Sequence, residues 1–336
     1  MRLHSLLSFI CLSLLALSAN AAQVLRVLSW PGYAEPEQVR QFEAKYDAKL
    51  EITIVGGDDE LWLKASKNKG QNYDVIALNT AILQTFIDQG LVQAINPKQI
   101  PNLKYQLPRF RQIASLSRNK QQYAVPYTYS EMGLIYNRKL VKSPPQSISE
   151  LWNPTYRDQV LIFNGSAHNF SLAAMQLGYS NPFQLSDKQI ANSTKKLVDL
   201  RQNVFKFYNT PEEATRLFTN NQIALIHANF GHQQVMSLRK AGADIAYIIP
   251  KEGALAWLDC WAILAGAKNM ELAHQWINFT LNKEMSQQLI NKQGLNNTRQ
   301  ESQHNVDHRK LIWLEPVENA TERSNLWSRV VSGHKK

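Results

Sequence analysis

The sequence contains almost no cysteine. Its 336 residues include only Cys11 and Cys260, and Cys11 lies in an apolar N-terminal segment that we expect to be removed. A single remaining thiol cannot form an internal disulfide, so the fold must depend on its hydrophobic core. The composition can supply such a core, because 44% of the residues are hydrophobic and no low-complexity tract occurs. A disulfide-stabilised scaffold is therefore excluded.

Long apolar runs are also missing after the first residues. No later stretch approaches the roughly 18 unbroken apolar residues of a membrane-spanning helix. At the start of the chain, the basic Arg2 precedes a short apolar segment, Leu6–Leu17, and small residues up to Ala21 and Ala22 follow. This order is typical of a secretory signal peptide. We predict a signal peptide over residues 1–22, cleavage after Ala21 or Ala22, and a periplasmic mature protein.

The common enzyme motifs are absent from the sequence. It has no G-x-S-x-G, no Walker loop and no G-x-G-x-x-G. His227 and His232 lie five residues apart and His168 elsewhere, a pattern that fits ordinary surface or hydrogen-bonded histidines better than a metal site. We therefore predict a protein that is not an enzyme, with no catalytic residue, cofactor or metal ligand. A glycosidase would need two facing carboxylates at a defined separation, which a sequence cannot show; turnover of the ligand would distinguish an enzyme from a binding protein.

Blocks of like charge are absent too. The net charge is +10, but no basic block is longer than Lys195–Lys196 or Lys335–Lys336. A basic balance can indicate nucleic acid, an anionic membrane surface or an acidic partner. Because the charges are scattered and the protein is predicted to be exported, no nucleic-acid partner is expected.

The first part of the mature chain alternates strands and helices. The predicted strands are Val24–Ser29, Leu50–Val55 and Tyr73–Leu78; the predicted helices are Pro36–Tyr46, Glu60–Lys67 with Asp58 or Asp59 as N-cap, and one opened by Asn79 and Thr80. Short connections in this order predict a parallel sheet with right-handed crossovers. Ligands bind outside the carboxyl ends of such strands. Residues 30–33, 56–60 and 79–80 are therefore candidate site positions.

The later chain leaves this sheet and returns to it. The alternating segment Tyr123–Asn137 predicts a strand that leaves the first lobe, and Val160–Phe163 begins a second sheet. The segment Ile245–Ala265 leads the chain back. This course predicts two lobes, a cleft and a hinge of at least two crossing strands. The expected division is residues 23–130 with 254–300 in lobe 1, and 131–253 with 301–336 in lobe 2.

The returning segment also carries a candidate anchor. Trp257 and Asp259 lie two residues apart in a strand-like run, so their side chains point to one face. An aromatic ring beside a carboxylate suits a cationic amine through cation–π attraction and a charge-assisted hydrogen bond. The alternative is a core tryptophan beside an aspartate that caps backbone amides. Cys260 points the other way and is expected to be buried.

Four stretches resemble one family. They are Leu25–Phe42 with its Trp-Pro-Gly-Tyr, the Tyr-Asp strand at Tyr73–Ile76, Val125–Tyr127, and Trp257–Asp259 followed by Gly266–Asn269. Together they resemble the periplasmic solute-binding proteins of ABC importers, specifically the spermidine/putrescine-binding branch, over nearly the whole mature chain. The resemblance implies a monomeric α/β protein with the two-lobed type II fold. Each lobe would be a mostly parallel sheet flanked by helices, with hinge strands between the lobes.

The resemblance also implies a ligand site. Its members would be Trp30 and Tyr33 as an aromatic wall, Asn79 and Thr80 as polar contacts at a helix start, Tyr129 where the family often has Trp, Trp257 as an indole wall, and Asp259 as the anionic anchor.

The sequence departs from the family at the second acidic cluster. The matching stretch here, Asn164–His168, has no carboxylate, and each buried ammonium needs a partner. Glu131 stands on the crossing strand where the family usually has a small neutral residue, so we predict that it pairs with a second ammonium. Glu60, in the acidic run that begins at Asp58, is a further candidate. The alternative interpretation of these acids is a hinge-surface charge and a helix cap.

Two functions follow from the resemblance. One is a transport receptor that closes over a polyamine and delivers it to a membrane permease. The other is a sensory adaptor that docks on the periplasmic domain of a signalling membrane protein, such as a cyclic-dinucleotide enzyme. Neighbouring permease and ATPase genes would favour the first, and a neighbouring membrane-anchored enzyme gene the second.

Overall fold

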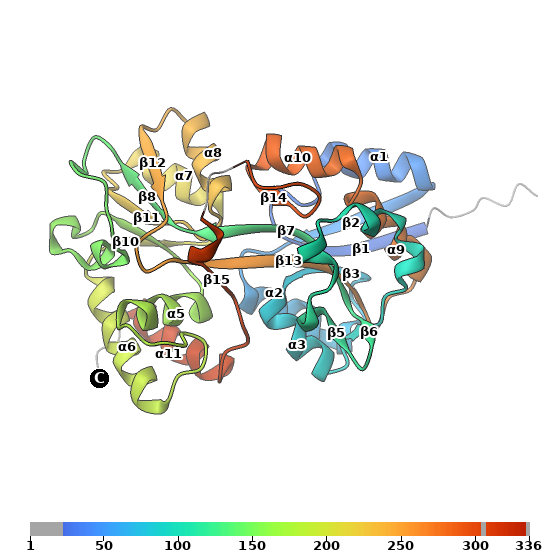
Figure 1. Cartoon of the computed structure of the whole chain (residues 1–336), viewed down its shortest axis with the longest axis horizontal. Helices are drawn as coiled ribbons and strands as arrows, with labels where there is room; N and C mark the ends of the chain where they lie inside the picture. Colours follow the sequence, from blue (N-terminus) through green and yellow to red (C-terminus); the bar gives the residue numbers. More distant parts are fainter. Residues whose placement is uncertain (1–22, 304–306, 334–336) are drawn as a thin grey trace, which may run out of the picture.

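The computed structural model describes residues 23–303 and 307–333, which form two lobes connected by long strands (Figure 1). The predicted signal peptide, residues 1–22, lies outside the described residues. Within those residues, no helix is both long and apolar enough to span a membrane.

The first lobe is built on a sheet with the order β14-β7-β13-β3-β1-β2, and β4 and β15 also pair with β13. Its strands are β1 Gln23–Ser29, β2 Ala48–Ile54, β3 Val75–Asn79, β4 Val92–Gln93, β7 Ala124–Met132, β13 Ala254–Leu264, β14 Asn296–Asn297 and β15 Leu311–Trp313. Its helices are α1 Pro36–Tyr46, α2 Asp58–Ser66, α3 Thr80–Asp88, α4 Pro108–Arg111, α9 Met270–Thr280 and α10 Lys283–Gln293. The short pair β5 Ser117–Arg118 and β6 Gln121–Gln122 stands apart from this sheet.

The predicted parallel core of this lobe is confirmed. β1 pairs in parallel with both β2 and β3, and α1 and α2 connect these strands. Asn79 begins α3 as predicted, because its side-chain oxygen accepts hydrogen bonds from Ala81 N at 3.1 Å and Ile82 N at 3.2 Å. The N-cap predicted for α2 was wrong: Gly57 takes that position, and Asp58 is the first helical residue.

The second lobe is a smaller sheet with the order β10-β9-β11-β8-β12. Its strands are β8 Leu134–Asn137, β9 Val160–Phe163, β10 Val204–Tyr208, β11 Leu225–His227 and β12 Ile245–Ile248. Its helices are α5 Ser166–Gln176, α6 Asp187–Arg201, α7 Pro211–Asn220 and α8 His232–Lys240. The strand β9 runs parallel to β10 and β11, whereas β8 is antiparallel to β11 and β12.

Two antiparallel strands, β7 and β13, cross between the lobes (Figure 1). The returning segment Ile245–Ala265 forms two separate strands, β12 and β13, and β13 is continuous over 11 residues. The long strand predicted at Tyr123–Asn137 is divided at Gly133, where the chain passes from one sheet to the other. A side chain there would lie 2.5 Å from the carbonyl oxygen of Ile248, so this crowded bend requires glycine.

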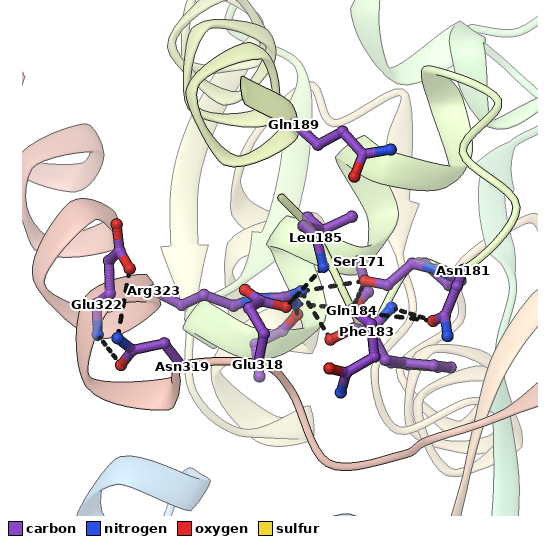
Figure 2. A network of polar contacts seen from close by, with 12 residues as sticks. Ser171, Asn181, Phe183, Gln184, Leu185, Gln189, Glu318, Asn319, Glu322 and Arg323 are labelled. Atoms are coloured by element: carbon purple, nitrogen blue, oxygen red, sulfur yellow. Dashed lines mark hydrogen bonds and ion pairs between the residues drawn. The ribbon is translucent and has the colours of Figure 1, made fainter. Parts of the chain in front are cut away.

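The C-terminal helix α11, Ala320–Ser332, packs against α5 and α6 (Figure 1). Its Arg323 is fully buried and forms an ion pair with Glu318 at 2.7 Å (Figure 2). The same guanidinium donates to Ser171 Oγ and to the carbonyl oxygen of Ala167, both at 3.1 Å. Every part of the buried charge is thus hydrogen-bonded, and the first turns of α5 are held in place.

Candidate functional site

A narrow cavity of about 40 Å³ lies between the lobes, with room for only a few water molecules. The first lobe and the crossing strand β13 contribute Trp30, Pro31, Tyr33, Gly56, Gly57, Asp58, Asn79, Trp257 and Asp259. The second lobe contributes Phe163, His168, Asn229, Phe230 and Gln233.

The position of the cavity follows from the sheet. The strands β1, β2 and β3 all end toward it, as expected for the carboxyl edge of a parallel sheet. The strand β13 runs antiparallel to β3, and its Asp259 stands opposite Asn79 at that edge. Backbone pairing therefore places the predicted anchor beside the predicted helix start.

Asp259 is a buried carboxylate without a cationic partner among the described residues. The hydroxyl of Tyr33 donates to its Oδ2 at 2.5 Å. Burial raises the pKa of Asp259 to about 8; the Tyr33 hydrogen bond opposes this rise, and the nearby charge of Asp58 adds to it. A cation beside Asp259 would offset the cost of burying its charge and lower its pKa, so the cavity suits a cationic ligand.

Asp58 is the second carboxylate of the cavity. Its two oxygens accept from the Asn79 side-chain amide at 3.1 and 3.2 Å, while Asn79 also caps α3. From the opposite lobe, Nε2 of His168 lies 3.5 Å from Asp58 Oδ2. Burial raises the pKa of Asp58, His168 and Asn79 lower it, and the neighbouring Asp59 raises it further. The net shift is upward.

The second-lobe wall is aromatic and amide-rich. The Phe163 ring stacks on His168 with ring centres 5.8 Å apart and meets Phe230 edge-on at 5.6 Å. The indole nitrogen of Trp257 donates to the carbonyl oxygen of Asn229 at 2.8 Å. Trp257 therefore bonds β13 directly to the second lobe.

Five of the predicted site residues meet at the cavity: Trp30, Tyr33, Asn79, Trp257 and Asp259. The expectation that Trp257 and Asp259 share a face is confirmed, and Cys260 is buried as predicted.

Tyr129 and Glu131 lie on the other face of the crossing strands. In the β7–β13 register, Tyr129 stands opposite Leu258 and Glu131 opposite Ala256. These partners alternate with Trp257 and Asp259, which face the cavity. Both side chains therefore point away from it, and the structure does not place them in the site.

Glu131 instead has partners at the hinge. Its carboxylate is 2.7 Å from His232 Nδ1, and the Tyr247 hydroxyl lies 3.4 Å from the same oxygen. This buried charge is thus matched within the protein. The prediction that Glu131 supplies the missing second carboxylate is corrected by this geometry.

Glu60 and Thr80 are also outside the cavity lining. Glu60 is half exposed, accepts from Gly56 N at 3.0 Å and pairs with Lys64 at 3.6 Å. Thr80 is the buried first residue of α3. Within the acidic run at 58–60, the residue that lines the cavity is Asp58.

Comparison with known proteins gives a consistent result. The family described as bacterial extracellular solute-binding protein matches residues 37–311. The spermidine/putrescine-binding periplasmic protein of Escherichia coli is 25% identical over 288 residues, covering 85% of this chain and 80% of its own. The spermidine/putrescine-binding periplasmic protein 1 of Haemophilus influenzae is 24% identical over 275 residues, covering 81% and 74%.

Solved structures share the fold. A putative spermidine/putrescine ABC transporter protein from Listeria monocytogenes superposes with a TM-score of 0.82 at 20% identity, covering 93% of this chain and 98% of its own. The Tp0655 lipoprotein of Treponema pallidum gives a TM-score of 0.79 at 20% identity, covering 92% and 99%. These likenesses confirm the predicted two-lobed α/β fold.

Proposed function

Because the chain belongs to the family of bacterial extracellular solute-binding proteins, we propose that it binds a polyamine between its lobes and presents it to the permease of an ABC importer. The observation that carries this proposal is the pair of carboxylates, Asp58 and Asp259, in one aromatic-lined cavity.

The charges of the lining favour a cationic ligand. The described lining residues include two aspartates, no lysine or arginine, and His168 as the one basic side chain. An ammonium group next to Asp259 would gain an ion pair, and the indole rings of Trp30 and Trp257 that line the same cavity can add cation–π attraction. An anionic solute would meet the two carboxylates without a matching guanidinium or ammonium. The acidic lining of the site is thus a better guide to the charge of the ligand than the basic net charge of the whole chain.

The names of the relatives support the same ligand class. The two curated relatives are named for binding spermidine and putrescine, and both names place them in the periplasm. Transfer of that ligand class to this chain agrees with its aspartates and aromatic rings. These names refer to binding and the structure title to ABC transport, so we propose transport rather than the sensory-adaptor alternative. A monomer exported through cleavage of residues 1–22 is part of the proposal.

Binding requires the lobes to move. The cavity is narrow and lies between the lobes, and the Trp257–Asn229 hydrogen bond links its two walls. We infer that the lobes separate about β7 and β13, with the bend at Gly133, to admit the ligand. Closure would then place the ammonium groups between the walls and remake the Trp257–Asn229 hydrogen bond. The ligand is captured and released unchanged, and no bond is broken.

A binding screen tests the proposal. Purified mature protein is heated with 1,4-diaminobutane, spermidine, 1-aminobutane, succinate or butanol, and unfolding is followed by fluorescence. Amines should raise the melting temperature, because a ligand at one hundred times its Kd adds about 2.7 kcal/mol to stability. Mass spectrometry should recover the bound amine unchanged. Stabilisation by succinate alone, or by none of the solutes, would overturn the proposed function.

A further inference from the structure

The first turn of α8, in the second lobe, lies against two parts of the first lobe. The helix α8 packs on α10 (Figure 1), and its Gln233 is buried in the wall of the cavity. The side-chain nitrogen of Gln233 donates to the carbonyl oxygen of Pro31 at 3.4 Å and to Oε1 of Gln293 at 3.1 Å. Pro31 lies in the loop after β1, and Gln293 is the last residue of α10. One amide group thus joins the second lobe to two elements of the first.

These two hydrogen bonds fix the orientation of the Gln233 amide. Its nitrogen carries two hydrogens, and each has an acceptor in the first lobe. In the reversed orientation the side-chain oxygen would face the carbonyl oxygen of Pro31, which cannot donate. Because Gln233 is only 4% exposed, losing a bond while the lobes stay closed would leave a buried amide hydrogen without a partner. The closed arrangement is therefore stabilised by both bonds.

The loop that Gln233 contacts carries the aromatic wall of the site. Trp30 and Tyr33 lie on either side of its turn, and both line the cavity. Gly32, within the turn, has a φ of +86°, and a side chain there would lie 2.5 Å from Gln293 Oε1 and 3.0 Å from Gln233 Nε2. The turn therefore requires glycine both for its backbone conformation and for the close approach of the two amides.

Gln293 holds the far end of the same loop. Its side-chain nitrogen donates to Oε1 of Glu35 at 3.1 Å, and Glu35 is the N-cap residue of α1. Gln293 itself is not among the described residues that line the cavity. The loop between β1 and α1 is thus attached to α10 within the first lobe, and Gln233 adds the attachment to the second lobe.

We propose that Gln233 is a positioning residue for ligand capture, which holds the loop of Trp30 and Tyr33 against the second lobe when the lobes close. This inference rests on the proposed amine-binding function. The ligand enters while the lobes are apart, so association does not depend on the bonds of Gln233. Escape requires these bonds to break, so they slow dissociation.

The test separates the rate of dissociation from the rate of association. Stopped-flow tryptophan fluorescence measures both rates for 1,4-diaminobutane at pH 7. Gln233→Met keeps the length of the side chain but removes the amide. It should raise the dissociation rate by about threefold to tenfold, the effect of one neutral hydrogen bond, and leave the association rate within about twofold of the wild type.

The matched control breaks an amide–amide bond that does not cross between the lobes. Gln288 on α10 accepts from the side-chain nitrogen of Gln38 on α1 at 3.2 Å, and both helices belong to the first lobe. Gln288→Met should therefore leave both rates at their wild-type values.

A second variant excludes direct contact with the ligand as the cause. Gln293→Met removes the partner of Gln233 from outside the cavity lining. It should also raise the dissociation rate, and the double variant should raise it by less than the product of the two single factors, because the two residues share one bond. Gln293→Met also provides the test if Gln233→Met does not fold by circular dichroism.

The outcomes separate the two proposals. An unchanged dissociation rate in either variant, or single effects that multiply in the double variant, would overturn the positioning role of Gln233 while amine binding stands. A loss of affinity that comes from slower association would overturn it as well. If calorimetry detects no binding of the diamine to the wild type, the proposed function itself is overturned.

Discussion

Two buried aspartates lie at opposite edges of the first-lobe sheet, one where strand β3 begins and one where it ends. The first stabilises the fold, whereas the second lies in the candidate site. Asp74 immediately precedes β3, and Asp259 stands opposite the last residue of that strand. Burial acts on both carboxyls. For Asp74, hydrogen bonds from Arg26 at 2.7 Å and from Lys268 N at 2.8 Å outweigh burial and lower the pKa.

Asp259 lacks such a cation. Its hydrogen bond comes from the neutral Tyr33 hydroxyl, and its pKa is raised to about 8. Two aspartates buried in the same sheet thus have pKa shifts of opposite sign, one at each edge of the sheet. The paired edge is part of the framework, whereas the unpaired edge holds a carboxylate whose charge needs a cation from outside.

The largest effect on binding is expected at Asp259. Asp259→Asn removes the charge but keeps the shape, so amine binding should weaken by about 3 kcal/mol or more in calorimetry. The raised pKa means that Asp259 lowers the stability of the ligand-free fold as pH rises from about 4 through 8. The free energy of unfolding of the Asn variant should fall less over this window. Unchanged affinity would remove Asp259 from the site.

The matched substitution at the other edge should act on folding instead. Asp74→Asn breaks the pair with Arg26, and the free energy of unfolding should fall by about 2 kcal/mol in urea titrations at pH 7. Because the pKa of Asp74 is lowered, this contribution is present above pH 4 and lost as pH falls through the folded pKa. Amine affinity should be nearly unchanged; a loss comparable to that of Asp259→Asn would erase the contrast between the edges.

A smaller effect is expected at the aromatic walls. Trp257→Ala or Trp30→Ala should weaken amine binding by about 1–2 kcal/mol, because the ammonium loses a cation–π contact. Ligand-induced quenching of tryptophan fluorescence should also be lost. If either variant instead fails to fold by circular dichroism, that tryptophan belongs to the framework rather than to the site.

The smallest effect is expected at Glu131. Its carboxylate is matched by His232 and Tyr247 and points away from the cavity. Glu131→Gln should therefore change monoamine and diamine affinities equally, because the lost charge does not reach the ligand. A selective loss of diamine affinity in calorimetry would show that Glu131 reaches the ligand after all.

The sequence allowed prediction of the features that depend on local pattern. The alternation of side chains along a strand placed Trp257 and Asp259 on one face. The rule that ligands bind at the carboxyl ends of parallel strands indicated Trp30, Tyr33 and Asn79. The face of Glu131 depends on cross-strand register between β7 and β13, which local pattern does not determine.

The second-lobe wall was the least predictable part of the site. His168, Asn229 and Phe230 reach the cavity only because of how one lobe faces the other, and no periodicity in their own segments records that. The choice of Asp58 over Glu60 depended on where α2 begins, at Asp58 directly after the N-cap Gly57, which sets the helical phase of both acids. The departures from the family pattern in Asn164–His168 were the one available signal for His168.

Direct titration of Asp259 tests the central claim, that this carboxyl is kept unpaired for a cationic ligand. Its side-chain carbon is followed by NMR against pH in the ligand-free protein and in the presence of 1,4-diaminobutane, with Asp259→Asn to assign the signal. We predict a pKa of about 8 without ligand and a clear fall when the diamine is bound. An ordinary pKa near 4 in the ligand-free protein, or a raised value that the diamine leaves unchanged, would contradict the account.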